Sequence, residues 1–272
     1  MIPKKNRLES PKISIVTICL NAGETIERAI KSVVAQTYSN IEYIVVDGVS
    51  NDSTQEIVGR YNDVITKFVS EPDEGIYHAM NKGIAMSTGD VIYFLNADDQ
   101  LYDENVVRDV SDVFTKHPET DIVYGDIVWV KDGGEKYHSQ DFPLSRLALA
   151  GKPIAHQSIF SKIDVFREAG PFKQEYRVVS DYEWVLKTYL SGRYRFQYIP
   201  RPIAYFYLHG RTSKERWRHE TLEVLQQHYS RWEIFIYRSI PDGFANLEKL
   251  LKASVRKCKK LLGIKGKILS RN

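Results

Sequence analysis

The first half of this chain alternates short apolar runs with stretches of helical period, and this alternation restricts the fold more than any other feature. The apolar runs occupy residues 13–17, 44–46, 64–69 and 91–95. Amphipathic stretches lie between them at residues 24–36, 53–61 and 76–86. Repeated strand, helix and strand segments predict an α/β fold, a mostly parallel sheet with helices on both faces.

The pattern changes after residue 121. Residues 122–130 and 136–138 flank the turn-forming residues 132–134 (DGG), which predicts a hairpin. A helix at residues 181–191 and strands at 194–199 and 204–208 follow. We find neither an internal repeat nor a low-complexity linker, so the second half is expected to continue the same domain.

Each apolar run of the first half is followed by polar side chains. The carboxyl ends of neighbouring parallel strands open on one crevice, so these side chains are expected to face a common ligand site. The alternative is turn chemistry, since Asp and Asn favour the turns that end strands. In chain order the residues are Thr17 and Asn21, then Asp47, then Glu71 and Asp73, then Asn96, Asp98 and Asp99.

The turn after the first run argues against a dinucleotide dehydrogenase. A dinucleotide cradle needs several glycines there, whereas residues 19–23 (CLNAG) contain one, and Walker-type spacing is also absent. A bound diphosphate would therefore need another neutralising group. Asp98 and Asp99 predict a divalent cation, Mg²⁺ or Mn²⁺, because these hard cations prefer carboxylate oxygens.

At these positions the chain resembles the inverting, GT-A-fold glycosyltransferases of family 2, and within them the bacterial enzymes of exopolysaccharide and O-antigen assembly, of the colanic-acid type. The resemblance covers roughly residues 11–213. The matching segments are residues 13–17 (ISIVT), 43–54 (YIVVDGVSNDST), 71–77 (EPDEGIY), 79–84 (AMNKGI), 89–99 (GDVIYFLNADD), 156–157 (HQ) and 180–182 (SDY).

The resemblance implies nucleotide and metal roles for residues at matching positions. Asp47 would accept the N–H of a uracil base, and Thr17 and Asn21 would line the same pocket. Asp98 would bind the metal, although Asn96 stands where the family has the first acid of its Asp-X-Asp motif. The other nucleotide-binding candidates are Asp73, Lys82 and Ala97, and Lys82 could also face solvent.

The resemblance also implies the catalytic base. Inversion needs a carboxylate that takes the acceptor proton during attack on the anomeric carbon, and Asp181 would supply it. The alternative is that Asp181 is an ordinary helix cap. The acceptor or donor-sugar candidates are Asp99, His156, Gln157 and Glu183.

Two further candidates lie in residues 207–213 (YLHGRTS). His209 would add a neutral imidazole ligand to the metal, and Arg211 would clamp the diphosphate. Each is equally compatible with a plain surface loop. Arg216 and Trp217 faintly resemble a motif of processive synthases, but Ser213 replaces its glutamine. We therefore expect a single sugar to be added per acceptor.

Together with the strand-end acids, the resemblance implies an inverting, metal-dependent enzyme that moves one sugar from a nucleotide-sugar, a UDP-sugar, to a glycan or lipid-linked acceptor in surface polysaccharide biosynthesis. One alternative is a nucleotidyltransferase, which would need a glycine-rich basic loop that residues 18–24 lack. Another is a non-catalytic nucleotide-binding scaffold, which Asn96 favours.

The predicted domain spans residues 11–213, with a nucleotide-sugar half at 11–130 and an acceptor half at 131–213. Residues 214–272 form a predicted helical, basic extension, and its segment 251–272 has eight basic side chains and no acid although the whole chain is only +3. That segment either contacts an anionic membrane or is simply solvated. A nucleic-acid partner is not expected, because its basic residues would be spread over the folded body.

The two cysteines, Cys19 and Cys258, are compatible with a reducing compartment. The apolar runs are too short to span a bilayer. We therefore expect a cytoplasmic protein, with peripheral attachment to the inner face of the cell membrane as the alternative.

Overall fold

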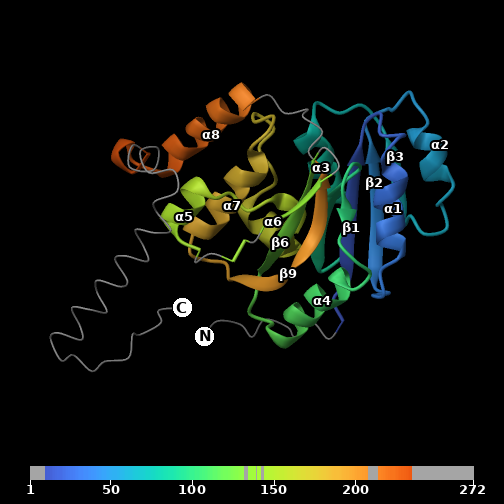
Figure 1. Ribbon diagram of the computed structural model, residues 1–272, viewed down its shortest axis with the longest axis horizontal. Coiled ribbons are helices and arrows are strands. Elements are labelled where there is room, and N and C mark those ends of the chain that lie inside the picture. The colour runs from blue at the N-terminus through green and yellow to red at the C-terminus, as the bar shows by residue number, and fades with distance from the viewer. Residues whose placement is uncertain (1–9, 132–133, 139, 142–143, 208–213, 235–272) are drawn as a thin grey trace. The chain divides into compact units, whose positions relative to one another are not determined.

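The computed structural model describes residues 10–131, 134–138, 140–141, 144–207 and 214–234 (Figure 1). The chain divides into two compact units. The larger contains residues 1–142 and 153–224, and the smaller contains residues 143–152 and 225–272. All predicted site residues that the structure describes belong to the larger unit. The predicted domain boundary after residue 213 stays a prediction.

The helices and strands follow one another in the order that the alternating pattern predicts for the first half. That half contains β1 (Ile13–Cys19), α1 (Ile26–Val34), β2 (Ile41–Asp47), α2 (Thr54–Gly59), β3 (Lys67–Ser70), α3 (Ile76–Met86), β4 (Val91–Asn96), β5 (Gln100–Leu101) and α4 (Val106–Lys116). The remainder contains β6 (Ile122–Lys131), β7 (Gly134–His138), α5 (Arg146–Gly151), η1 (His156–Ser158), β8 (Ile159–Lys162), α6 (Ile163–Ala169), α7 (Ser180–Leu190), β9 (Phe196–Tyr207) and α8 (Lys214–His228).

Within the described residues, nine strands form one sheet in the order β3-β2-β1-β4-β8-β6-β9-β5, and β7 pairs with β6. The strands β3, β2, β1 and β4 are parallel, and Figure 1 shows the first three side by side. Beyond β4 the sheet is mixed, because β8 runs antiparallel to both β4 and β6. The predicted α/β fold is confirmed, with its parallel part confined to β3-β2-β1-β4 and the β6–β9 pair.

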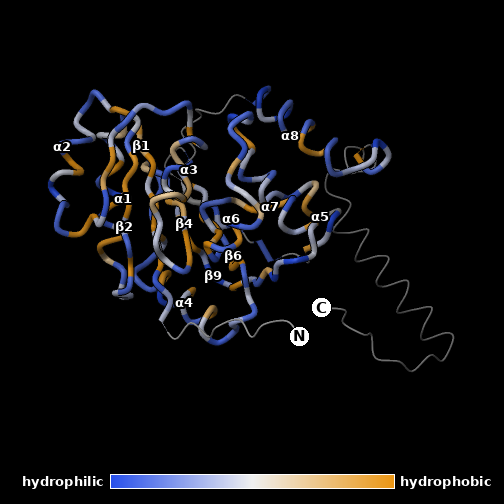
Figure 2. Tube along the Cα trace, turned by 180° about the vertical axis from the view of Figure 1, so that it is seen from behind, coloured by the Kyte–Doolittle hydropathy of each residue, from blue (hydrophilic) through white to orange (hydrophobic). Residues whose placement is uncertain are grey.

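Helices cover both faces of the sheet, which explains why β1 is buried along its whole length. One face packs Ile13 and Ile15 into a core with apolar side chains of α1, α2 and α4. On the other face α3 contacts β1 and β2, and Phe94 of β4 packs edge-on against Phe166 of α6. Figure 2 shows the hydrophobic colouring concentrated in the central strands.

The helix α3 approaches β1 very closely at Gly83. A Cβ atom at Gly83 would lie 2.4 Å from Cγ1 of Val16, so only glycine permits this packing distance. The predicted helix at residues 76–86 is confirmed residue for residue by α3.

Two strand predictions in the chain need correction. The third run forms a strand only over Lys67–Ser70. The two strands predicted at residues 194–199 and 204–208 are replaced, within the described residues, by one long strand, β9. Pro202 lies within β9 opposite Asp126, where the pairing of β9 with β6 is irregular. Proline is tolerated at such irregularities because no regular ladder hydrogen bond is lost.

The hairpin prediction is confirmed by the antiparallel pairing of β6 with β7, in which Lys131 lies opposite Gly134.

Among the described residues, no helix has the length and apolar character needed to cross a membrane.

Candidate functional site

The strand order brings the predicted polar residues to one edge of the sheet. Because β3, β2, β1 and β4 are parallel neighbours, their carboxyl ends point the same way. In the register Asp47 lies opposite Cys19 on one side and Ser70 on the other, and Ile18 lies opposite Asn96. The convergence predicted from the strand ends is therefore present.

Asp47 ends β2 and is fully buried. Its carboxylate accepts hydrogen bonds from the Ser50 amide at 3.0 Å, from the Ser50 hydroxyl, and from the Ser70 hydroxyl at 2.6 Å. The thiol of Cys19 lies 3.6 Å from Oδ1. Asp47 therefore joins the ends of three neighbouring strands. The contacts of Ser50 and Ser70 with Asp47 were not predicted from the sequence.

Thr17 is also fully buried, and its hydroxyl lies 3.1 Å from the hydroxyl of Tyr43 in the core. Asn21, in contrast, is exposed after β1, and its Oδ1 accepts the Asn51 amide at 2.9 Å. Of these two predicted nucleotide contacts, Asn21 alone has surface to offer a ligand.

The loops after β1 and β2 hold the backbone in unusual conformations. Asn21 has φ 50° and Val49 has φ 64°, and among the described residues these are the positive-φ positions outside glycine. Left-handed backbone is a genuine outlier for a β-branched residue such as Val49. Strain of this kind concentrates at functional sites, so it favours a site over ordinary turns.

Asp73 lies directly over Gly48. A Cβ atom at Gly48 would lie 2.5 Å from Oδ2 of Asp73, so the glycine makes room for this carboxylate. The other oxygen of Asp73 accepts the Gly75 amide at 2.9 Å.

Lys82 on α3 faces the loop that follows β3. Its ammonium donates to the Pro72 carbonyl at 2.7 Å and pairs with Glu71 at 3.0 Å. Lys82 therefore fastens that loop to α3, whereas the sequence predicted a nucleotide contact for it.

The Asn96-Ala-Asp-Asp99 segment leaves β4 at the same edge. Oδ1 of Asn96 is buried and has no hydrogen-bond partner among the described residues, and Ala97 is buried beside it. Asp98 is half-buried, and its carbonyl accepts a hydrogen bond from Arg28 of α1 at 2.6 Å. Arg28, whose guanidinium also lies 3.7 Å from the ring centroid of Tyr207, was not predicted from the sequence.

Asp99 is fully buried and both of its carboxylate oxygens are engaged. Oδ1 accepts the Tyr207 amide at 3.0 Å, and Oδ2 accepts Nε2 of Gln157 at 3.2 Å. Burial, followed by the neighbouring charge of Asp98, raises the pKa of Asp99 to about 7.

Asp181 lies in the first turn of α7, with side chain 19% exposed. Oδ1 accepts the hydroxyl of Tyr77 at 2.8 Å, and Oδ2 lies 2.8 Å from Nδ1 of His156. The helix cap residue is Val179, and Oδ1 of Asp181 also accepts the Tyr182 amide at 2.9 Å, so the carboxylate supports the first turn of α7 besides contacting Tyr77 and His156. Tyr77 was missed from the sequence, although its segment 71–77 belonged to the resemblance.

The charge state of Asp181 follows from these partners. Burial alone would raise its pKa, but the hydrogen bond and charge of His156, the Tyr77 hydroxyl and the Tyr182 amide together hold the pKa below its ordinary value. The group is therefore a carboxylate at neutral pH, placed near a helix N-terminus that favours negative charge.

Glu183 occupies a different environment from Asp181. It is 1% exposed and pairs with Lys173 at 3.1 Å and with Lys187 at 3.9 Å. Residues two apart on a helix face different directions, which is why the two acids do not share partners. The predicted sugar contact of Glu183 is not supported by this placement.

His209 and Arg211 lie outside the described residues. Among the described residues, no cluster of three or more His, Cys, Asp or Glu side chains is arranged to hold a metal ion. A cation at this edge would therefore depend on Asp98 with oxygen ligands of another kind, such as the amide of Asn96.

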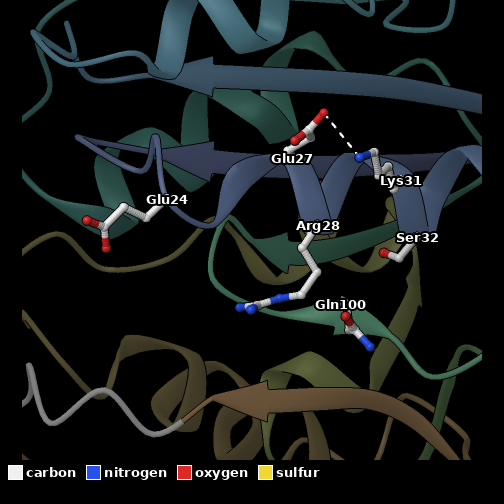
Figure 3. Close-up of a pocket in the computed structure, with 6 residues that line it drawn as sticks. All are labelled: Glu24, Glu27, Arg28, Lys31, Ser32 and Gln100. Atoms are coloured by element: carbon white, nitrogen blue, oxygen red, sulfur yellow. Dashed lines mark ion pairs between the residues drawn. The ribbon is translucent and has the colours of Figure 1, made fainter.

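A surface pocket of about 490 Å³ borders the Asp98 segment through Arg28 (Figure 3). In Figure 3 the side chain of Arg28 extends from α1 with its guanidinium turned away from Gln100, and Glu27 pairs with Lys31. None of the predicted site residues lines it. The lining residues are Glu24, Glu27, Arg28, Lys31, Ser32 and Gln100.

Comparison with known sequences identifies a family. The family described as "Glycosyl transferase family 2" matches residues 14–201. A curated relative, the PGL/p-HBAD biosynthesis glycosyltransferase of Mycobacterium bovis, is 29% identical over 200 residues, which are 72% of this chain and 77% of the relative.

Solved structures share the fold at low sequence identity. Staphylococcus aureus TarS 1-349 in complex with UDP has a TM-score of 0.63 at 18% identity, over 80% of this chain and 65% of that one. The mannosyltransferase PcManGT from Pyrobaculum calidifontis, in complex with GDP-Man and Mn²⁺, has a TM-score of 0.62 at 20% identity, over 80% and 63%. The chain thus spans less than two-thirds of either solved chain.

Proposed function

This chain belongs to glycosyl transferase family 2 and is a sugar-transferring enzyme, and on that premise we propose that it is inverting and metal-dependent. It moves one sugar from a UDP-sugar to a glycan or lipid-linked acceptor. One observation carries the proposal. Gln157 donates a hydrogen bond to Asp99, and the neighbouring residue, His156, contacts Asp181. The segment 96–99 and the Asp181 carboxylate therefore belong to one connected centre.

The donor half of this centre is the edge formed by the loops after β1, β2 and β3. Asn21 and Asp73 offer polar atoms there, and Leu20 and Val49 are each about half exposed and offer apolar surface for a base. Asp47 acts beneath them by holding the strand ends together. The complex of TarS with UDP supports a uridine nucleotide.

The residues present fit a divalent cation. The Asn96 amide oxygen is buried and accepts no hydrogen bond from the part of the chain that the structure describes, and the Asp98 carboxylate lies two residues away. Both are hard oxygen ligands of the kind Mg²⁺ and Mn²⁺ prefer. Such a cation would neutralise the diphosphate and so assist its departure. Asp99, with both oxygens engaged, supports the segment from within, and His209 is kept as a further candidate ligand.

The acceptor half is the centre around Asp181, which is ionised and held by groups from α3 and η1. Inversion in one displacement requires a proton acceptor on the side of the sugar opposite the leaving diphosphate. We assign that role to Asp181, with Gln157 and His156 available to sugar hydroxyls. Arg211 is kept as a candidate diphosphate clamp.

The acceptor class rests on the family resemblance, which favours a glycan or lipid-linked acceptor in surface polysaccharide assembly of the exopolysaccharide or O-antigen kind. A mycobacterial relative is named for PGL/p-HBAD biosynthesis. Residues 251–272, which lie outside the described residues, would hold the enzyme on an anionic membrane at the cytoplasmic face.

The proposal is tested first by binding. A thermal-shift screen of UDP, GDP, dTDP and their sugars, with and without Mn²⁺, should give the largest metal-dependent rise in melting temperature with a uridine nucleotide. The accepted donor is then incubated with lipid-linked and free glycan acceptors, and the anomeric configuration of the product is read by NMR. Retention of configuration would rule out the inverting mechanism.

Two other outcomes separate the alternatives. Release of pyrophosphate from a nucleoside triphosphate would indicate a nucleotidyltransferase. Tight UDP binding without hydrolysis or transfer of any donor would indicate a scaffold, the reading that Asn96 favours.

A further inference from the structure

Glu220 of α8 has a buried carboxylate that binds backbone amides of a distant segment. It accepts hydrogen bonds from the Arg177 amide at 3.0 Å and from the Val178 amide at 2.9 Å, and the residue is 8% exposed. Hydrogen bonds from backbone N–H groups to a carboxylate are among the strong ones in proteins. The helix α8 begins after residue 213, where the sequence predicts the end of the transferase domain, yet this side chain binds a segment well inside that domain.

The segment that Glu220 binds leads directly into α7. Arg177 and Val178 come immediately before Val179, the cap residue of that helix. Asp181 lies two residues further on, in the first turn. Because no loop intervenes, a carboxylate that fixes the amides of residues 177 and 178 also fixes the point at which α7 begins.

The same segment is attached to the start of α3. The guanidinium of Arg177 donates a hydrogen bond to the carbonyl of Glu74, just before α3, and Tyr77 in the first turn of α3 donates to Oδ1 of Asp181 at 2.8 Å. Glu220 therefore holds the backbone from which the Arg177 side chain extends toward α3.

The backbone and the side chain of Asp181 are thus held by different elements. Tyr77 of α3 and His156 of η1 contact the carboxylate itself and orient it. The bonds of Glu220 are to main-chain amides, so they act on the position of the whole first turn. The side chain of Asp181 is 19% exposed and so remains open to an acceptor hydroxyl.

We propose that Glu220 is a positioning residue for sugar transfer, which holds the start of α7 so that Asp181 can reach the acceptor hydroxyl. This inference rests on the proposed function, in which Asp181 is the base. A general base must lie within hydrogen-bond reach of the proton that it removes, and a displacement of about 1 Å can lower the rate by about 100-fold. The helix α8 therefore contributes to the transfer reaction although it lies beyond the predicted transferase domain.

The central test is Glu220→Gln. The carboxamide keeps the shape of the side chain, but its nitrogen cannot accept a hydrogen bond from a backbone amide. We expect kcat to fall by roughly 10- to 100-fold, with the affinity for UDP by calorimetry within about twofold of wild type. Activity is measured at a temperature at which the variant is folded.

The matched control is Glu42→Gln. Glu42 is also a buried carboxylate, 2% exposed, and it accepts the Thr88 amide at 2.8 Å. It lies near the start of β2, whereas Asp47 lies at the end of that strand, at the candidate site. The control should lower the melting temperature but keep kcat within about twofold of wild type.

Three outcomes would overturn the inference. A wild-type kcat in Glu220→Gln would limit Glu220 to stability, and so would an equal fall of kcat in Glu42→Gln. A loss of UDP affinity as large as the loss of kcat would place the effect in the donor half. If Glu220→Gln does not fold, Glu220→Asp, which keeps the charge on a shorter side chain, decides by the same comparison of kcat with UDP affinity.

A second measurement does not depend on turnover. Amide hydrogen exchange of residues 177–183 should be faster in Glu220→Gln than in wild type, whereas exchange of residues 13–19 in β1 should be unchanged. An equal increase in both segments would mean that Glu220 acts on global stability and would contradict the inference. If the wild-type protein turns over no donor, the proposed function fails, whereas the exchange result still decides whether Glu220 holds the start of α7.

Discussion

The side-chain amide of Gln157 donates a hydrogen bond to the carboxylate of Asp99 at 3.2 Å, and both side chains are buried. The next residue back, His156, contacts Asp181. Two consecutive side chains of the short helix η1 therefore contact Asp99, which follows β4, and Asp181, in the first turn of α7. A substitution at Gln157 should consequently disturb residues 96–99 as well as the local packing.

Replacing Gln157 with leucine should destabilise the protein by about 1–3 kcal/mol, because Oδ2 of Asp99 is left without its donor in the interior. The loss is measured by urea unfolding at neutral pH. Gln174→Leu, at an exposed position, is the control and should change the free energy of unfolding by no more than about 0.5 kcal/mol. Equal effects of the two substitutions would contradict the role given to the Gln157–Asp99 bond.

Asp98→Asn should raise the Mn²⁺ concentration needed for half of the rise in melting temperature by roughly tenfold or more, as expected when a carboxylate ligand is lost. The measurement is the melting temperature of the UDP-bound protein titrated with Mn²⁺. Removal of metal from the wild-type enzyme with EDTA should abolish transfer, and added Mn²⁺ should restore it. A wild-type Mn²⁺ response in the variant would exclude Asp98 as the main ligand.

Asp99→Asn should have a smaller effect on the Mn²⁺ titration than Asp98→Asn. The reason is that both oxygens of Asp99 already accept hydrogen bonds from Gln157 and Tyr207. A larger effect at Asp99 than at Asp98 would mean that the buried acid reorients to bind the cation.

Glu42, on β2, should make stability depend on pH. Burial would raise its pKa, but hydrogen bonds from Ser14, Thr88 and Lys67 lower it from 4.5 to about 2. A carboxyl group with a lower pKa in the folded state contributes stability above its unfolded pKa and loses it as the pH falls. The difference between wild type and Glu42→Gln should be about 3 kcal/mol at pH 7 and should shrink between pH 4.5 and pH 2.

The control for that measurement is Glu56→Gln, which removes an exposed ion pair with Arg60. Exposed pairs of this kind contribute little, so this variant should follow the wild-type curve at every pH. A Glu42→Gln difference that stays constant with pH would show that Glu42 is not ionised through its bonds in the folded state.

Two glycine substitutions should have effects of opposite sign. Gly83→Ala places a Cβ atom 2.4 Å from Val16 in the packed layer between α3 and β1, and should cost about 1–3 kcal/mol. Gly59→Ala, at the last residue of α2, meets nothing within 4 Å and should add about 0.4–1 kcal/mol by restricting the unfolded chain. Thermal unfolding of both variants measures these changes. A Gly83→Ala variant as stable as the wild type would contradict the close packing of α3 on β1.

Much of the fold could be predicted because it depends on local periodicity. The segment 76–86 has one apolar face, and α3 covers the same residues. The strand-end acids also follow from position alone, since parallel neighbours must end at one edge. Prediction was weaker for β9, which was expected as two separate strands, and for β5 and β8, which are too short to have a period of their own.

The sequence by itself determined the alternation of strands and helices, the position of the acids after β2 and β4, and the family resemblance that assigned Asp98 and Asp181. It could not determine which side chains would meet. Asp47 proved to be an internal support, Lys82 an anchor for the loop after β3, and Asp181 a partner of His156 and Tyr77. Periodicity records which face of a segment is buried, whereas a hydrogen bond between distant residues exists only once the sheet order has brought their segments together.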